Sequence, residues 1–392
     1  MGWDVLVADQ GKNEEALRVV RNEIAAGTVA SEALEASAAK IYLSAIEKAE
    51  DKVEAVSCTA NALLATATKG DRRLALNFVA SGGMDVVLDI ILQEKEQKLK
   101  AVLACAKIAH VIFASTEYED NHWLEPLASL LYWALNTKCD ALTFELFAVA
   151  YALATKEPLS LVTNDSFINL LRYVLLLMPC TSTLYLNRQV ATLRILMLVP
   201  ESNFNAILSS NICLHAQSDV DINNDRQFIC RRLLFILKMQ LWRYAVEADR
   251  AIHPDRDLVP PLDIARKLLQ FEPEIVRATI FPPEANAPYE SLLHKQQTKA
   301  QNTDLMSSTT NINTIQDDNN VHPVDAPPYA LRTLLFQLQT DINATVKRFA
   351  NELLFEICHR DTKEFTLRCG LGNAVAYLQA QRILNGISYP PS

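Results

Sequence analysis

A glycine pair near the C-terminal end of the sequence could belong to a nucleotide site. Gly370 and Gly372, with Leu371 between them, match the start of the dinucleotide fingerprint G-x-G-x-x-G. That fingerprint functions where it follows a strand and opens a helix, so that backbone N–H groups hold a pyrophosphate. Here the preceding residues have helical spacing, and Val375 stands at the third glycine position. We therefore expect no nucleotide site at this motif.

Cysteine and histidine do not occur with the spacing of metal or catalytic sites. The eight cysteines are spread singly without a CxxC pair, and most lie among apolar neighbours, as Cys105 does. The seven histidines are scattered, and we interpret His110 and His215 as packing or surface residues. No Ser/His/Asp set, HExxH motif or P-loop is present. We expect no catalytic residue, no cofactor and no metal site, and we interpret the protein as not an enzyme.

Basic residues leave a binding function open. The net charge of −9 disfavours nucleic acid as a partner. Basic side chains nevertheless gather in residues 225–250, at Arg72 and Arg73, and at Lys347 and Arg348. These residues are either solvated helix faces or parts of a basic wall that grips an acidic or carboxylate-ending peptide helix. The sequence alone keeps both interpretations open.

The elements that must position these residues are helices. The chain has only 9 glycines, and none occurs in the 286 residues between Gly83 and Gly370. Strand-rich folds use glycine for the positive φ angles of hairpins and tight turns. The glycine distribution therefore predicts an all-α protein.

Apolar residues recur at three- and four-residue spacing along most of the chain, which predicts successive amphipathic helices. One such stripe comprises Val53, Val56, Ala60, Leu63, Leu64 and Ala67. The pair Gly82-Gly83 ends one apolar stripe and starts another, as in the turn before the third helix of an armadillo repeat. We favour an armadillo/HEAT-like right-handed α-solenoid over a compact helix bundle.

The predicted organisation has three parts. Residues 1–294 form armadillo-like helical repeats, and residues 329–387 form C-terminal repeats of the same solenoid. Residues 295–328 are rich in Gln, Asn, Thr, Ser and Asp and form a polar, flexible insertion loop. The dispersed cysteines are typical of a reducing compartment, and no segment is typical of a signal peptide or a membrane span. We expect a cytoplasmic protein with no integral membrane segment.

Four segments carry a recognisable pattern. Residues 345–358 are TVKRFANELLFEIC, residues 369–378 are CGLGNAVAYL, residues 277–283 are RATIFPP and residues 194–200 are RILMLVP. They resemble, in that order, four segments of the synembryn family: a V-K-x-x-A-x-E-x-L-F-x-L-C helix, a G-Y-G-N-A-A-G-L-L segment, an R-x-x-x-L-P-P segment and an N-L-L-x-N-L-P helix end. The resemblance covers roughly residues 140–385.

The resemblance implies a function without catalytic side-chain chemistry. A synembryn would be a non-receptor guanine-nucleotide exchange factor and folding chaperone for heterotrimeric G-protein α subunits. It would be a monomer that captures the C-terminal helix of a nucleotide-free or GDP-bound α subunit on its concave face. Its partner would recruit it to the cell cortex or plasma membrane. We expect Arg72, Arg73, Lys347 and Arg348 to contact that helix and its carboxylate, and Asn373 to cap the terminal helices.

Two observations limit this interpretation. Leu371 replaces the family's usual Tyr, and Val375-Ala376 replace Ala-Gly. The alternative is a generic armadillo adaptor or scaffold that binds peptide segments of other proteins. Such adaptors use regularly spaced Trp and Asn residues, whereas the four tryptophans here, at positions 3, 123, 133 and 242, are not regularly spaced.

Overall fold

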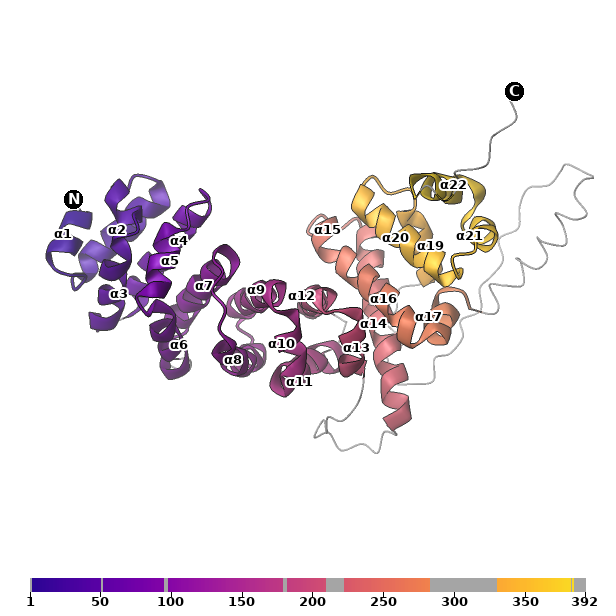
Figure 1. The fold of residues 1–392 in the computed structure, drawn as a ribbon, viewed down its shortest axis with the longest axis horizontal. Coiled ribbons are helices and arrows are strands. Elements are labelled where there is room, and N and C mark those ends of the chain that lie inside the picture. The colour runs from indigo at the N-terminus through magenta and orange to yellow at the C-terminus, as the bar shows by residue number, and fades with distance from the viewer. Residues whose placement is uncertain are drawn as a thin grey trace, which may run out of the picture. The chain divides into compact units, whose positions relative to one another are not determined.

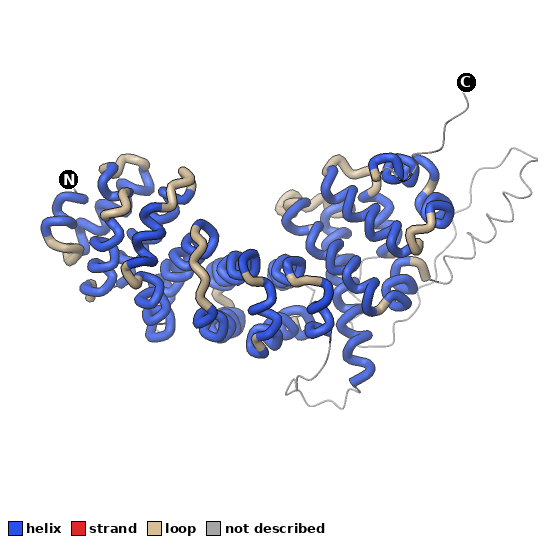
Figure 2. Tube along the Cα trace, in the orientation of Figure 1, coloured by secondary structure: helices blue, strands red, loops and turns tan. Residues whose placement is uncertain are grey.

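The computed structural model describes residues 2–50, 52–94, 98–178, 182–208, 222–282, 330–381 and 383. All regular secondary structure in these ranges is helical, as Figure 2 shows, so the prediction of an all-α protein is confirmed. The predicted insertion at 295–328 lies outside the described residues. So does residue 387, the predicted end of the last repeats.

The chain forms two compact units, a division that the sequence did not predict. Unit 1 comprises Met1–Tyr173 and Leu198–Asn203, and unit 2 comprises Val174–Met197 and Phe204–Ser392. The helices of residues 1–173 are α1 (Gly2–Ala8), α2 (Glu14–Ala26), α3 (Ala38–Lys48), α4 (Lys52–Ala67), α5 (Arg73–Ala80), α6 (Gly83–Glu94), α7 (Leu99–Ser115), α8 (Leu124–Asn136), α9 (Asp140–Lys156), α10 (Pro158–Thr163) and α11 (Asp165–Arg172).

The helices that follow belong mainly to unit 2. After a π-helical turn at Tyr173–Leu177 come α12 (Thr183–Leu198), α13 (Glu201–Leu208), α14 (Ile222–Ala245), α15 (Pro254–Asp257), α16 (Val259–Phe271), α17 (Pro273–Ile280), α19 (Leu331–Leu338), α20 (Ala344–Ile357), α21 (Thr362–Cys369) and α22 (Leu371–Ala380).

Unit 1 is a stack of repeated helices. Helix α2 packs on α4, α4 on α7 and α7 on α9, and one to two shorter helices come between successive members of this series. The shorter helices α3, α6 and α8 pack on α4, α7 and α9 and lie along the other side of the series, as Figure 1 shows. Sequential packing of this kind is typical of helical repeat proteins. Right-handed winding of the whole chain stays a prediction.

Unit 2 is organised around α16. This helix packs against α14, α15, α17 and α20, and most of its residues are buried. Pro260 and Pro261 stand in its first turn, where the missing N–H of proline leaves no helical hydrogen bond unmade. Of the C-terminal helices, α20 packs directly on α16, α21 packs on α20, and α22 packs on α21.

The turn at Gly82 and Gly83 has the predicted structure. Helix α5 ends at Ala80, and α6 begins at Gly83 with its axis bent by 72° from that of α5. Gly82 has a φ of +81°, a conformation that side chains disfavour. A Cβ atom on Gly83 would lie 2.3 Å from the Phe78 ring, so the second glycine lets α6 start directly against α5.

One predicted apolar stripe is corrected by the structure. Val56 and Leu63 are buried as expected, but Leu64 is 51% exposed. Adjacent residues of an α-helix point about 100° apart, so Leu63 and Leu64 cannot both lie at the centre of the buried face. Leu64 therefore belongs to the surface of α4.

Within the described ranges, no single helix is both long and apolar enough to cross a membrane. Helices α5 and α6 meet the length and composition requirement only as a pair, across their 72° bend.

Substitution of Gly83 tests the turn. We expect Gly83→Ala to lower the free energy of unfolding by about 1–3 kcal/mol, because the new methyl group collides with Phe78. Gly372→Ala is the matched control, since a Cβ there meets no atom within 4 Å. The control should be neutral or stabilising by about 0.5–1 kcal/mol in urea unfolding followed by circular dichroism. Equal stability of the two variants would contradict the packing role of Gly83.

Candidate protein-binding surfaces

The four cations predicted to contact a partner are divided between the two units. Arg72 and Arg73 stand at the start of α5 in unit 1, and Lys347 and Arg348 lie on α20 in unit 2. Each pair is therefore a separate candidate surface.

The pair in unit 1 contains one compensated and one uncompensated charge. Arg73 binds Asp71 through its Nη2 atom at 2.7 Å and its Nε atom at 3.1 Å. Hydrogen bonds from Arg73 lower the pKa of the Asp71 carboxyl to about 2. Arg72 is exposed and has no ion-pair partner among the described residues. Of the two, Arg72 is the cation available to a ligand.

The pair in unit 2 is similarly divided. Arg348 lies 3.6 Å from the Glu352 carboxylate one turn along α20, and its guanidinium stacks 5.1 Å from the Phe349 ring centroid. Lys347 is half-buried and has no ion-pair partner in the described part of the chain. Its backbone carbonyl accepts a hydrogen bond from Asn351 at 2.8 Å. Lys347 is therefore the uncompensated charge on this helix.

Several basic side chains of residues 225–250 form ion pairs or hydrogen bonds within unit 2. Arg226 pairs with Glu272, and Arg243 is nearly buried and pairs with Asp249 at 2.6 Å. Arg232 donates to the Leu175 carbonyl at 3.1 Å and to the Met178 carbonyl. These contacts favour the structural interpretation of this run over the binding interpretation.

Basic side chains also cap helix ends elsewhere in the chain. The last carbonyls of a helix have no partner within the helix. Lys267 on α16 is buried and donates to the Leu196 and Met197 carbonyls at the end of α12, at 3.3 and 2.6 Å. Lys156 on α9 donates to carbonyls just beyond the end of α7, at Thr116 and at Tyr118 (2.8 Å), and burial lowers its pKa. Lys52 donates to the Ile46 carbonyl near the end of α3 at 3.2 Å.

A surface that the sequence did not single out runs across α4, α7 and α9. These helices pack side by side, and each exposes the side turned away from the shorter helices. We name this surface the open face. It comprises the exposed and half-exposed side chains of Asn61, Leu64, Lys107, His110, Phe144 and Glu145.

The open face combines exposed apolar groups with one uncompensated cation. Leu64 is 51% and Phe144 36% exposed. His110 Nδ1 lies 2.7 Å from Glu145 Oε1, which joins α7 to α9 and occupies the only carboxylate of the open face. Lys107, one turn before His110, has no ion-pair partner among the residues that the structure describes. Such a surface is suited to a helix that carries apolar and acidic side chains.

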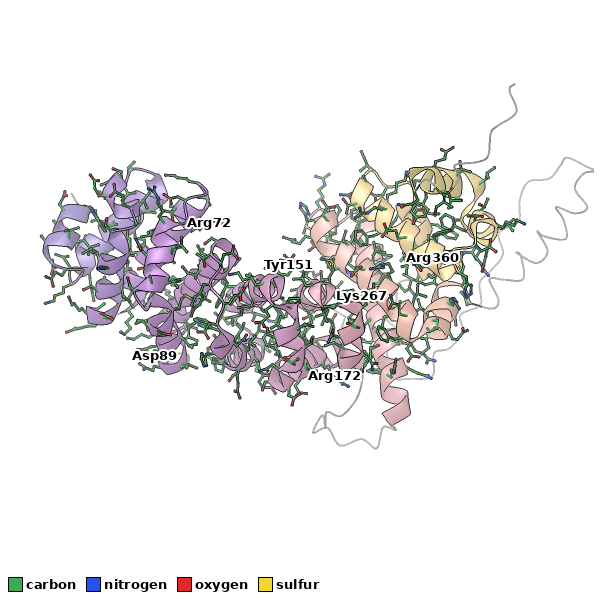
Figure 3. The ribbon with its side chains drawn as sticks, in the orientation of Figure 1. Arg72, Asp89, Tyr151, Arg172, Lys267 and Arg360 are labelled. Atoms are coloured by element: carbon green, nitrogen blue, oxygen red, sulfur yellow. The ribbon has the colours of Figure 1, made fainter. Side chains whose placement is uncertain are left out.

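Arg72 lies on the same side of unit 1 as this surface. In Figure 3, Arg72 and Tyr151 of α9 lie along one edge of the unit, and Asp89 of α6 lies along the opposite edge. Tyr151 follows Phe144 by two helical turns and continues the exposed side of α9. The sequence could have indicated the open face through the polar positions Lys107 and His110, which interrupt an otherwise apolar helix.

The C-terminal helices are joined by a buried amide network. Gln339 and Asn351 are 1% and 2% exposed and are hydrogen-bonded at 2.8 Å. Asn373 donates to Gln339 at 3.3 Å and to the Cys369 carbonyl at 3.4 Å, where α21 ends. Asn373 thus links the terminal helices, as the sequence analysis predicted.

The described residues contain no group of three or more His, Cys, Asp or Glu that could hold a metal ion. Burial raises the pKa of the Cys58, Cys105, Cys230 and Cys369 thiols to about 12, so these cysteines are inert packing residues. His215 lies outside the described residues.

The fold defines an all-helical repeat protein. Among solved structures, the chain is similar to the crystal structure of an engineered protein from the Northeast Structural Genomics Consortium. The two are 12% identical, the match covers 94% of this chain and 91% of that chain, and the TM-score is 0.43. No protein-family model matches the chain, and no curated protein matches it.

Removal of Lys267 tests the capping role of buried cations. We expect Lys267→Met to lower the free energy of unfolding by about 3–5 kcal/mol, because two carbonyls lose their buried donor and Asp263 retains only Arg266 of its two cations. Lys363→Met, at an exposed position of α21, should change it by less than about 0.5 kcal/mol. The measurement is urea unfolding, and matching values for the two variants would show that the buried ammonium is dispensable.

Proposed function

We propose that this chain is a synembryn-type armadillo protein, a non-receptor guanine-nucleotide exchange factor and folding chaperone for G-protein α subunits. The observation that carries the proposal is the packing of the segments that resemble that family. Residues 277–282 are far apart in the sequence from residues 345–358 and 369–378, but they form one packed cluster, in which α17 contacts α20, α20 contacts α21 and α21 contacts α22. His359 and Arg368 directly border the last two segments. Arg277 lies 2.9 Å from His359, and Arg368 stacks 4.7 Å from the Phe281 ring centroid. This packing supports the interpretation of the segments as parts of one module.

The aromatic interior of that cluster adds further support. Phe355, Phe365 and Tyr377 come from α20, α21 and α22, and their ring centroids lie 5.3–5.7 Å apart in edge-on contacts. Such contacts stabilise a defined arrangement of rings. The aromatic residues in the segments that resemble the family therefore share a structural role. Binding of the α subunit would depend instead on the open face and on the cations of α5 and α20.

The open face and Arg72 provide a docking surface for the C-terminal helix of the α subunit. Leu64 and Phe144 would contact its apolar side, and Lys107 and Arg72 would face its acidic side chains or its carboxylate. In unit 2, Lys347 is the available cation. Arg73 in unit 1 would have to release Asp71, and Arg348 in unit 2 would have to release Glu352, before either could bind the ligand.

Nucleotide exchange in this proposal requires no catalytic side chain. A protein that binds the nucleotide-free α subunit more tightly than the nucleotide-bound one shifts the population towards release of the nucleotide. The same preference stabilises a newly made α subunit before it binds nucleotide. We place the protein in the cytoplasm as a monomer, with recruitment to the cell cortex or plasma membrane by its partner.

A generic adaptor that binds peptide segments is the second candidate. It is favoured by the exposure of Leu64 and Phe144, because an apolar helix surface accepts many peptide helices. The two candidates differ in whether binding depends on the nucleotide state of an α subunit.

The nucleotide state provides the test. We expect the purified chain to retain nucleotide-free α subunit at least roughly tenfold more strongly than GTP-loaded α subunit, which corresponds to about 1.4 kcal/mol of differential affinity. The measurement is a pull-down with both forms at equal concentration, followed by titration. Equal retention of both forms, or retention of neither, would remove the exchange-factor proposal.

Charge reversal separates the two candidate surfaces. Arg72→Glu with Lys107→Glu, and separately Lys347→Glu with Arg348→Glu, should weaken α-subunit binding roughly tenfold or more while the thermal melt stays unchanged. Lys12→Glu with Lys40→Glu and Arg250→Glu with Lys363→Glu, all at exposed positions, are controls with the same change of charge. A large fall in melting temperature would show that the altered residues have a structural role. If the control variants bind the α subunit equally weakly, the loss of affinity is due to the net charge of the protein.

A further inference from the structure

Arg332 on α19 is a half-buried cation that has no ion-pair partner in the part of the chain that the structure describes. Its guanidinium stacks on two aromatic rings, 5.7 Å from the Phe281 centroid and 5.1 Å from the Phe336 centroid. Among the described residues it has no ion pair and no hydrogen bond from its side chain. Arginine has five N–H donors, and a half-buried guanidinium is normally bound to a carboxylate, a carbonyl or a phosphate.

A second arginine lies on the same ring. The Arg368 guanidinium from α21 stacks 4.7 Å from the Phe281 centroid and is bound through Nε to Glu364 at 2.7 Å. Two positive charges therefore lie near the Phe281 ring, and Glu364 is bound to one of them, Arg368. Burial, together with the nearby Arg368, lowers the pKa of Arg332.

Cation–π stacking explains part of this arrangement. A guanidinium over an aromatic ring gains about 0.5–2 kcal/mol, and the two rings restrict the orientation of the Arg332 fork. Stacking leaves the in-plane N–H donors unused, because the rings contact only the faces of the guanidinium. The arrangement thus leaves a donor fork at a partly exposed position, with no carboxylate bound to it among the described residues.

We infer that Arg332, with Arg368 beside it, binds an oxyanion, namely a carboxylate or phosphate group of a ligand. An oxyanion would accept paired hydrogen bonds from the Arg332 fork and would supply the negative charge that Arg332 does not receive from the described residues. This site lies in unit 2, and it does not depend on the identity of the partner proposed above.

The test uses the full chain and inorganic phosphate at constant ionic strength. We expect the wild-type chain to bind phosphate in isothermal titration calorimetry and its melting temperature to rise with phosphate concentration. Arg332→Gln should bind phosphate roughly tenfold more weakly and lose this rise, since a charge-assisted hydrogen bond is removed. Arg360→Gln removes an exposed arginine of the same unit that pairs with Glu356, and it should behave as the wild type.

Acetate at the same ionic strength distinguishes the two ligand groups. Binding of both anions assigns the site to carboxylates and phosphates alike, and binding of phosphate alone assigns it to phosphate esters. If Arg332→Gln does not fold, Arg332→Lys is the replacement variant, because lysine keeps the positive charge but lacks the planar pair of donors. It should bind phosphate more weakly than the wild type. No binding of either anion to the wild type, or equal loss in Arg360→Gln, would overturn the inference.

Discussion

A stack of helices must satisfy the carbonyl groups at the end of every helix. Each end leaves four carbonyls without helical partners, and a left-handed glycine is the usual remedy. This chain has 9 glycines, and Gly27 ends α2 in that way. At other ends, lysine side chains from later helices donate to the carbonyls, as the buried Lys267 does for α12 and the half-buried Lys52 does near the end of α3. These contacts tie helix ends to helices that follow them in the chain.

This constraint explains what the sequence could and could not predict. Glycine scarcity indicated an all-α fold, and the Gly82-Gly83 pair indicated the turn between α5 and α6, because both follow from local backbone geometry. The use of a cation depends on residues far away in the chain. Arg232 binds carbonyls more than 50 positions earlier, so the sequence could not show that it is unavailable to a ligand. The exposure of Leu64 likewise depends on which neighbours cover α4.

The cations that remain without protein partners are the informative ones. Of the four predicted contact residues, Arg72 and Lys347 have no carboxylate partner in the described chain, whereas Arg73 and Arg348 do. Lys107 and Arg332 join the first two; Lys107 interrupts an apolar stretch of the sequence, whereas no sequence pattern marks out Arg332. Other exposed cations of the described chain, such as Lys12 and Lys40, also have no ion pair. What distinguishes Lys107 and Arg332 is the apolar or aromatic side chains beside them, which is a basis for selective binding of negatively charged partners.

The contact between Lys267 and the end of α12 also bears on how the protein folds. Stacked helices form mostly local contacts and fold rapidly from any point in the stack. This contact joins residues 70 and 71 positions apart. During synthesis, the carbonyls of Leu196 and Met197 cannot bind Lys267 until α16 has left the ribosome. The contact thus couples the stability of α12 to that of a helix made much later, a dependence that an array of nearest-neighbour contacts does not have.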